Sequence, residues 1–140
     1  MSDQIDVNQL SNALQQKVDL PSGKSQADID YVVEWQRPTT ENGYTWYRLY
    51  KSGWVEQGGY YTYTSQDNNF QIILPVNMES EKYTIITTLR NNNTNAGFVN
   101  VDNTSGISST GFYCRIVNKA NAGCSPLGVF WEVKGFAAQS

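Results

Sequence analysis

The sequence predicts an all-β protein, an antiparallel β-sandwich knob of about eight short strands that follows a short N-terminal helix. Two patterns indicate this fold. After Ala27, apolar and polar residues alternate with a period of two, as in strands that bury one face. Clusters of Gly, Pro, Asn and Ser, which are typical of turns, separate the alternating runs. With 140 residues, the chain is long enough for one such domain.

The first segment has a helical pattern instead. Its apolar residues are spaced three or four apart, which places them on one helical face: Val7, Leu10, Leu14 and Val18. Asp6 can cap this helix, and the Pro-Ser-Gly of residues 21–23 ends it. A helix this short is marginal alone in water, so we expect the end of a coiled-coil stalk; a frayed leader helix is the alternative. The predicted organisation is a stalk and linker over residues 1–30 and a β-sandwich over residues 31–140.

The predicted strands follow one another with short turns between them. In chain order they cover residues 31–36, 44–50, the segment after 53, 70–74, 83–89, the segment around Phe98, 112–117 and 129–133. Several strands carry apolar residues on both faces, for example Val32 with Val33 and Ile85 with Ile86. A lone sandwich is expected to have one wet face per sheet, so this pattern predicts a second buried face provided by subunit contact.

One hairpin has a readable register. The link 51–53 (Lys-Ser-Gly) suits a type I turn followed by a left-handed glycine. If Tyr50 faces Trp54, then Arg48 faces Glu56 and Trp46 faces Gly58. Trp46 can then lay its ring across a residue that has no side chain, and the glycine pair 58–59 predicts a bulge or a close approach. Arg48 and Glu56 could form a site, but cross-strand pairing already explains them.

Composition limits the function. The chain has no histidine, which excludes Ser-His-Asp and Cys-His catalysis and zinc sites that use imidazole. A net charge of −3 argues against nucleic acid, and no apolar run is long enough to insert into a membrane. A glycan-cleaving enzyme would need two paired carboxylates, and the candidates are scattered: Glu34, Glu41, Glu56, Asp67 and Glu132. We therefore expect no catalysis, no metal and no cofactor.

The two cysteines are predicted to be free thiols. Cys114 lies in an apolar run and Cys124 in a Gly/Asn-rich loop. A hairpin between runs 112–117 and 129–133 would place Cys114 opposite residues near Trp131 rather than opposite Cys124. The absence of an N-terminal secretion signal agrees with synthesis in a reducing compartment.

The run WYRLYKSGWVEQGG, residues 46–59, resembles a segment of bacteriophage tail-fibre C-terminal domains, and the final WEVKG, residues 131–135, is similar to their terminal strand. The likeness covers roughly Tyr31 to Phe136. It implies a homotrimeric β knob at the fibre tip that recognises a bacterial surface receptor, with the rest of the fibre at its N-terminus. It further implies no cofactor and no catalysis, with synthesis in the host cytoplasm and residence in the virion. The shared residues are expected to mark the fold: Trp46, Arg48, Tyr50, Gly53, Trp54, Glu56, Gly58, Gly59, Trp131 and Gly135.

The receptor site is predicted on loops. If successive strands run in opposite directions, loops 37–43, 65–69, 91–95 and 118–126 lie at the end away from the stalk. Their polar residues are the candidates for receptor binding: Thr40, Glu41, Asn42, Asp67, Asn68, Asn91, Asn92, Asn93, Thr94, Asn95, Lys119 and Asn121. Amides complement sugar hydroxyls, although the same residues also suit turns. Tyrosines could add apolar faces for sugar rings: Tyr44, Tyr60, Tyr61 and Tyr63.

The predicted function is therefore a viral adhesin that binds a surface glycan or an outer-surface protein. Two alternatives stay open. A non-catalytic carbohydrate-binding module would be a monomer with a planar aromatic platform. A purely structural fibre or collar domain would bind nothing outside the virion.

Overall fold

The computed structural model describes residues 29–63, 69–92, 97–102, 106–118 and 126–139. These ranges contain nine β-strands and no helix, which confirms the predicted all-β class. The strands are β1 (Val32–Gln36), β2 (Trp46–Tyr50), β3 (Trp54–Thr62), β4 (Asn69–Ile73), β5 (Thr84–Asn91), β6 (Gly97–Val101), β7 (Ile107–Ser108), β8 (Gly111–Asn118) and β9 (Pro126–Phe136). The predicted stalk helix and Cys124 lie outside the described residues.

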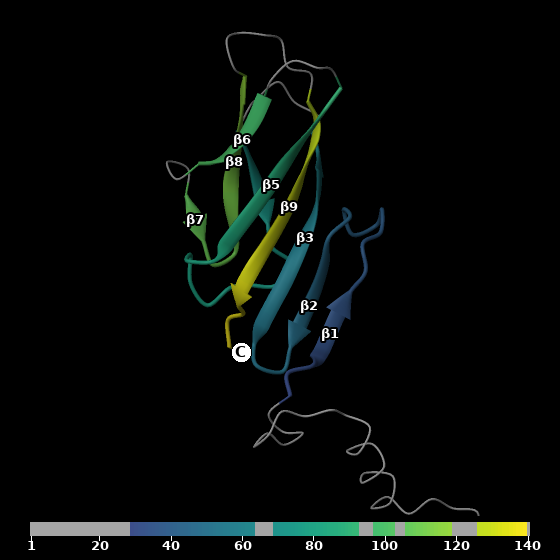
Figure 1. The fold of residues 1–140 in the computed structure, drawn as a ribbon, viewed down its shortest axis with the longest axis vertical. Helices are drawn as coiled ribbons and strands as arrows, with labels where there is room; N and C mark the ends of the chain where they lie inside the picture. Colours follow the sequence, from purple (N-terminus) through teal and green to yellow (C-terminus); the bar gives the residue numbers. More distant parts are fainter. Residues whose placement is uncertain (1–28, 64–68, 93–96, 103–105, 119–125, 140) are drawn as a thin grey trace, which may run out of the picture. The chain divides into compact units, whose positions relative to one another are not determined.

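The strands form two antiparallel sheets (Figure 1). One has five strands in the order β1-β2-β3-β9-β5. The other has the order β4-β8-β6, with β7 also pairing to β8. Every pair in both sheets is antiparallel, as the sandwich prediction requires. Across the described ranges, no helix is long and apolar enough to cross a membrane.

The core lies between the two sheets because alternate residues of each strand point inward. The five-stranded sheet contributes Val55, Val129, Trp131 and Val133, and the other sheet contributes Phe70, Ile72, Phe112, Cys114 and Ile116. The Phe112 and Trp131 rings meet edge to face across the gap, with centroids 6.1 Å apart. Tyr61 stacks on Phe70 with centroids 4.2 Å apart. Full burial of each large apolar side chain stabilises the fold by about 1.5–3 kcal/mol.

The β2–β3 hairpin has the predicted register, with Trp46 opposite Gly58 and Arg48 opposite Glu56. Gly53 takes the left-handed conformation (φ 92°), and its N–H donates to the Tyr50 carbonyl at 2.9 Å. The glycine pair permits close approach rather than a bulge, since β3 pairs without a break along β2 and β9. A Cβ on Gly58 would lie 2.7 Å from the Trp46 ring. One on Gly59 would lie 2.9 Å from the Trp131 ring, on the inner side.

Runs 112–117 and 129–133 do not form the hairpin that would place Cys114 opposite residues near Trp131. These runs are β8 and β9, which belong to different sheets. Cys114 pairs with Phe70 on β4 and with Val101 on β6, not with residues near Trp131. The reason is that both strands are central in their sheets: β9 already has β3 and β5 as neighbours, and β8 has β4 and β6. Cys114 is free and fully buried, as predicted for a thiol, and burial raises its pKa to about 12.

The ends of the strands agree with the predicted directions, with one exception. Asn91 pairs with Pro126, Gly97 with Asn118 and Thr62 with Gly128. The strand ends that flank three of the predicted loops, 65–69, 91–95 and 118–126, therefore lie at one end of the sandwich. The 37–45 loop does not reach that end. Because β1 and β2 are short and Trp46 pairs with Gly58, this loop stops beside the middle of β3 (Figure 1). Thr40, Glu41 and Asn42 therefore lie alongside the five-stranded sheet rather than at its end.

Candidate functional site

The outer face of the five-stranded sheet, meaning the face turned away from the core, is organised in rows across the strands. One row is charged and lies near the base, meaning the end of the sheet that carries the 51–53 turn. It contains Lys134, Glu56 and Arg48, which are neighbours in register. Its ion pair runs along β9, from Lys134 Nζ to Glu132 Oε1 at 3.3 Å, and within the described sheet Arg48 and Glu56 form none. The rows beyond it carry aromatic residues and glycines, and there the face is hollowed.

This hollow, the outer-face groove, has a volume of about 470 Å³. It is lined by Pro38, Tyr44, Trp46, Gly59, Tyr60, Thr62, Arg90 and Phe130. The volume falls within the range of roughly 300–1,000 Å³ that is usual for small-ligand sites. Four of the lining residues are aromatic, and two of them, Tyr44 and Phe130, are exposed. The groove therefore offers open aromatic faces to a ligand.

Glycines set the depth of the groove. The Trp46 ring lies over Gly58, as described for the hairpin, and Tyr60 lies over Gly128 on β9, where a Cβ would collide with the Tyr60 hydroxyl. Tyr60 also packs on Phe130, with ring centroids 4.7 Å apart. Since Gly128 pairs with Thr62 on one side and Arg90 on the other, the Tyr60 hydroxyl lies over the row that contains both of these residues.

The 37–45 loop places Tyr44 at the groove. Tyr44 has a φ of 61°, in the left-handed region that a bulky residue rarely adopts, and it follows Gly43 at 69°. Such a conformation costs on the order of 1–3 kcal/mol and is characteristic of functional sites. The Tyr44 ring meets Tyr60 edge to face, with centroids 6.3 Å apart. The loop thus holds a strained aromatic residue against the groove.

Hydrogen bonds within the loop maintain this conformation. Asn42 Oδ1 accepts from the Thr39 N–H at 2.9 Å, and Asn42 Nδ2 donates to the Arg37 carbonyl at 2.8 Å. The Tyr44 N–H donates to the Thr39 carbonyl at 2.8 Å. Hydrogen bonds from its own backbone N–H and from Thr40 and Thr39 lower the pKa of the exposed Glu41 carboxyl. The amide of Asn42, a predicted receptor contact, is therefore already engaged in building the loop.

Of the other predicted site residues, the structure describes only Asn91 and Asn92. Asn91 ends β5 directly after Arg90, and the Asn92 N–H donates to Asn91 Oδ1 at 3.1 Å. The remaining candidates lie outside the described residues: Asp67, Asn68, Asn93, Thr94, Asn95, Lys119 and Asn121. Among the predicted tyrosines, Tyr44 and Tyr60 line the groove. Tyr61 and Tyr63 are partly buried and pack against the core instead.

The groove contains residues that the sequence prediction missed, namely Thr62, Arg90 and Phe130. The sequence prediction assigned the binding groups to polar loops, whereas these three residues lie on strands. The alternation of inward and outward residues along β5 and β9 could have identified Arg90 and Phe130 as residues of the outer face. Arg90 continues the outward positions of the β5 strand, and Phe130 lies between the inward residues Val129 and Trp131.

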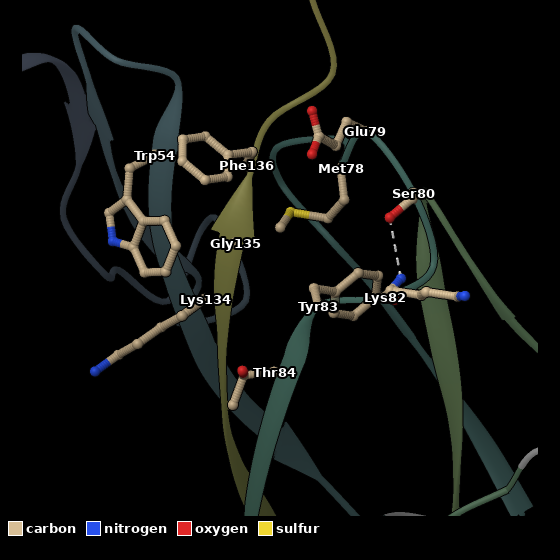
Figure 2. Close-up of a pocket in the computed structure, with 10 residues that line it drawn as sticks. All are labelled: Trp54, Met78, Glu79, Ser80, Lys82, Tyr83, Thr84, Lys134, Gly135 and Phe136. Atoms are coloured by element: carbon tan, nitrogen blue, oxygen red, sulfur yellow. Dashed lines mark hydrogen bonds between the residues drawn. The ribbon is translucent and has the colours of Figure 1, made fainter.

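A second, smaller pocket lies at the base and has a volume of about 190 Å³ (Figure 2). Its lining residues are Trp54, Met78, Glu79, Ser80, Lys82, Tyr83, Thr84, Lys134, Gly135 and Phe136. Trp54 meets Phe136 edge to face at 5.4 Å, and the Tyr83 hydroxyl donates to the carbonyls of Ser108 and Gly111 at 2.9 and 3.1 Å. These groups hold the base together, so the larger outer-face groove is the better candidate for a binding site.

Two of the carboxylates proposed for the enzyme alternative, Glu34 and Glu132, have other partners. Glu34 accepts a hydrogen bond from the Tyr47 hydroxyl at 2.5 Å, which raises the pKa of Tyr47, and Glu132 pairs with Lys134. None of these carboxylates lines the groove as described. Within the described ranges, no three His, Cys, Asp or Glu side chains gather as a metal site requires. The groove lining provides stacking surfaces, hydroxyl groups and one guanidinium, which is a set of groups suited to binding.

Comparisons of the chain with protein-family models, with curated proteins and with solved structures found no match. Its function is therefore inferred from the groove and from the sequence motifs.

Proposed function

We propose that this chain is the receptor-binding tip domain of a bacteriophage tail fibre, which binds a glycan on the bacterial surface as a homotrimer and does not cleave it. The observation that carries the proposal is the outer-face groove, where four aromatic side chains surround a hollow floored by glycine. A glycan is the best occupant because the apolar faces of sugar rings pack on aromatic rings while their hydroxyls need polar partners. Tyr60, Thr62 and Arg90 supply such partners at one end of the groove.

The resemblance to tail-fibre domains supports the proposal from the sequence side. The residues of the first motif form the β2–β3 hairpin, and the closing motif lies on β9 beside it. Within the motif, Trp46 and Gly59 line the groove, and Gly58 makes room for the Trp46 ring. The shared residues thus act as the frame of the proposed site, while residues outside the motif, such as Arg90 and Phe130, provide the contacts that select a ligand.

The homotrimer is proposed from the resemblance and from the edge strand β1. Val32, Val33 and Trp35 on this strand are 39%, 51% and 66% exposed. As the sheet is described, β1 is its last strand and pairs only with β2. An edge strand with exposed apolar side chains on both faces favours association with another chain. Contact through β1 would leave the groove open at the other end of the hairpin, and three grooves per tip would increase avidity for a repeating surface polymer.

Binding to cells and to glycans tests the proposed site. The labelled 140-residue protein is incubated with a panel of bacteria and with an array of bacterial surface glycans. Phe130→Ala removes an exposed ring from the groove, and we expect it to weaken binding about tenfold, the equivalent of about 1.4 kcal/mol. Phe98→Ala is the matched control, since Phe98 is exposed to a similar extent (47% against 50%) but lies on β6 of the other sheet. We expect this control to bind as the wild type does.

Tyr44→Gly provides a second test of the groove. Glycine adopts the left-handed conformation without strain, so we expect the melting temperature to stay equal or rise while binding falls. Equal losses for Phe130→Ala and Phe98→Ala would contradict the proposed site. Failure of the wild-type protein to bind any cell or glycan would contradict the proposed function and favour a structural fibre piece.

A further inference from the structure

Arg90 is the one charged side chain among the described residues that line the groove. It lies near the end of β5 and is exposed. Its guanidinium forms neither an ion pair nor a hydrogen bond with any residue that the structure describes. By contrast, the base of the same face carries both signs of charge, with Lys134 paired to Glu132. None of the described lining residues is a carboxylate, so the unpaired Arg90 guanidinium gives this part of the groove a positive charge in a chain whose net charge is −3.

The surroundings of Arg90 suit a planar anion. In register, Arg90 faces Gly128, and Gly128 faces Thr62 on β3. Because Gly128 has no side chain, the Tyr60 hydroxyl occupies the space above it, between the two polar residues. A guanidinium and two hydroxyls are thus presented in one row at the end of the aromatic surface. Arginine binds carboxylates through two parallel N–H donors, and hydroxyls can donate to the remaining lone pairs.

We infer that the groove selects an acidic sugar, with the carboxylate of a uronic acid-type residue on Arg90 and its ring against the aromatic side chains. This inference rests on the proposed glycan-binding function and names the chemical class of the ligand. A carboxylate fits better than a phosphate monoester, which carries up to two negative charges against the single guanidinium. A neutral sugar would leave Arg90 without a charged partner in the complex.

The test uses matched oligosaccharides on an array: uronic acid oligomers, their carboxyl-reduced neutral forms with the same linkages, and hexose oligomers that carry phosphate. We expect the wild-type protein to bind a uronic acid oligomer at least about tenfold more tightly than its neutral form. Added salt is expected to reduce this preference, since part of it is electrostatic. Arg90→Gln is expected to remove the preference and to change binding of the neutral form by less than about threefold. Arg90→Lys keeps the charge but loses the two-pronged geometry, so an intermediate preference is expected.

Arg115→Gln is the matched control. Arg115 is also an exposed strand arginine, but it lies on β8 of the other sheet. We expect this variant to keep the full preference for the acidic oligomer. Thermal unfolding of all variants identifies any change that arises from loss of fold.

The possible outcomes separate the two proposals. Equal binding of acidic and neutral oligomers, or a preference that survives Arg90→Gln, would overturn the inference while leaving glycan binding intact. A preference for the phosphate-bearing oligomers would likewise overturn the carboxylate assignment. Absence of binding to every oligosaccharide and every cell would instead contradict the proposed function itself.

Discussion

Gln57 shows how a single polar residue can connect the core to a distant segment. Its side chain is fully buried on the inner face of β3. The amide accepts a hydrogen bond from the Val76 N–H at 2.9 Å and donates to the Val76 carbonyl at 2.8 Å. It therefore pairs with the β4–β5 link in the way that a neighbouring strand would. The link has few other means of satisfying these two backbone groups at the base of the sandwich.

Replacing this amide tests its importance for stability. Gln57→Leu keeps a similar volume but leaves the N–H and carbonyl of Val76 without their partner, and we expect the free energy of unfolding to fall by about 1–3 kcal/mol. The measurement is urea unfolding followed by tryptophan fluorescence. Gln71→Leu, at an exposed position on β4, is the control and is expected to change stability by less than about 0.5 kcal/mol. Equal effects of the two changes would show that the buried amide contributes no special stability.

At the scale of elements, Tyr83 ties the start of β5 to the β7–β8 turn. Its hydroxyl donates to the carbonyls of Ser108 and Gly111, two residues that flank this turn. Partial burial raises the pKa of Tyr83 to about 12. The phenol must keep its proton to donate, so the connection between the two sheets depends on the neutral form.

This dependence predicts a change of stability at alkaline pH. Because the folded-state pKa lies above the ordinary value of 10, the contribution is fully present below pH 10 and is lost as the pH rises toward 12. We expect Tyr83→Phe to lower the free energy of unfolding by about 1 kcal/mol at pH 8, a modest value because the side chain is only partly buried. The difference between wild type and variant is expected to shrink at pH 11–12. Urea unfolding at several pH values measures it, and a difference that stays constant over this range would contradict the prediction.

The positions of the strands could largely be predicted from the sequence, whereas the pairing between strands could not. Alternation located the strands, and the 51–53 turn fixed the register of the β2–β3 hairpin through Gly53. Alternation says which residues share a face but not which strand lies alongside. For that reason the sequence does not reveal that runs 112–117 and 129–133 lie in different sheets, each as a central strand. The two-residue strand β7 is too short to produce a pattern.

At the scale of the whole molecule, the candidate site too combines residues that the local sequence indicates with residues that only strand pairing brings together. Tyr44 and Tyr60 were predicted as binding surfaces, and both line the groove. Arg90 and Phe130 were missed because they lie 40 and 80 residues after the end of β2, and no motif connects them to it. Only the pairing of β3, β9 and β5 brings them to Tyr60. Apolar residues on both faces of the strands predict a second face buried by subunit contact. In the single chain, Ile86 and Phe130 on the outer face are exposed, so burial of this face stays a prediction.

The exposed apolar edge strand β1 predicts that the protein forms an oligomer. We expect the 140-residue protein to have the mass of a trimer by size exclusion with light scattering at micromolar concentration. Trp35→Glu places a charge on the exposed edge strand and is expected to shift the protein toward the monomer. Ile73→Glu is the control, because Ile73 is exposed to a similar extent (69% against 66%) on β4 of the other sheet. A monomeric wild type would contradict the trimer, and a Trp35→Glu variant that remains trimeric would place the contact elsewhere.

Because β1 and β2 are only five residues long, the 37–45 loop lies outside the core between the sheets. The loop borders the groove through Pro38 and Tyr44, yet none of its residues belongs to the buried cluster between the sheets. Insertions or deletions there would remodel one wall of the groove at little cost to folding. If the chain binds glycans as proposed, variation in the length of this one loop would change which ligands fit while the sandwich stays intact.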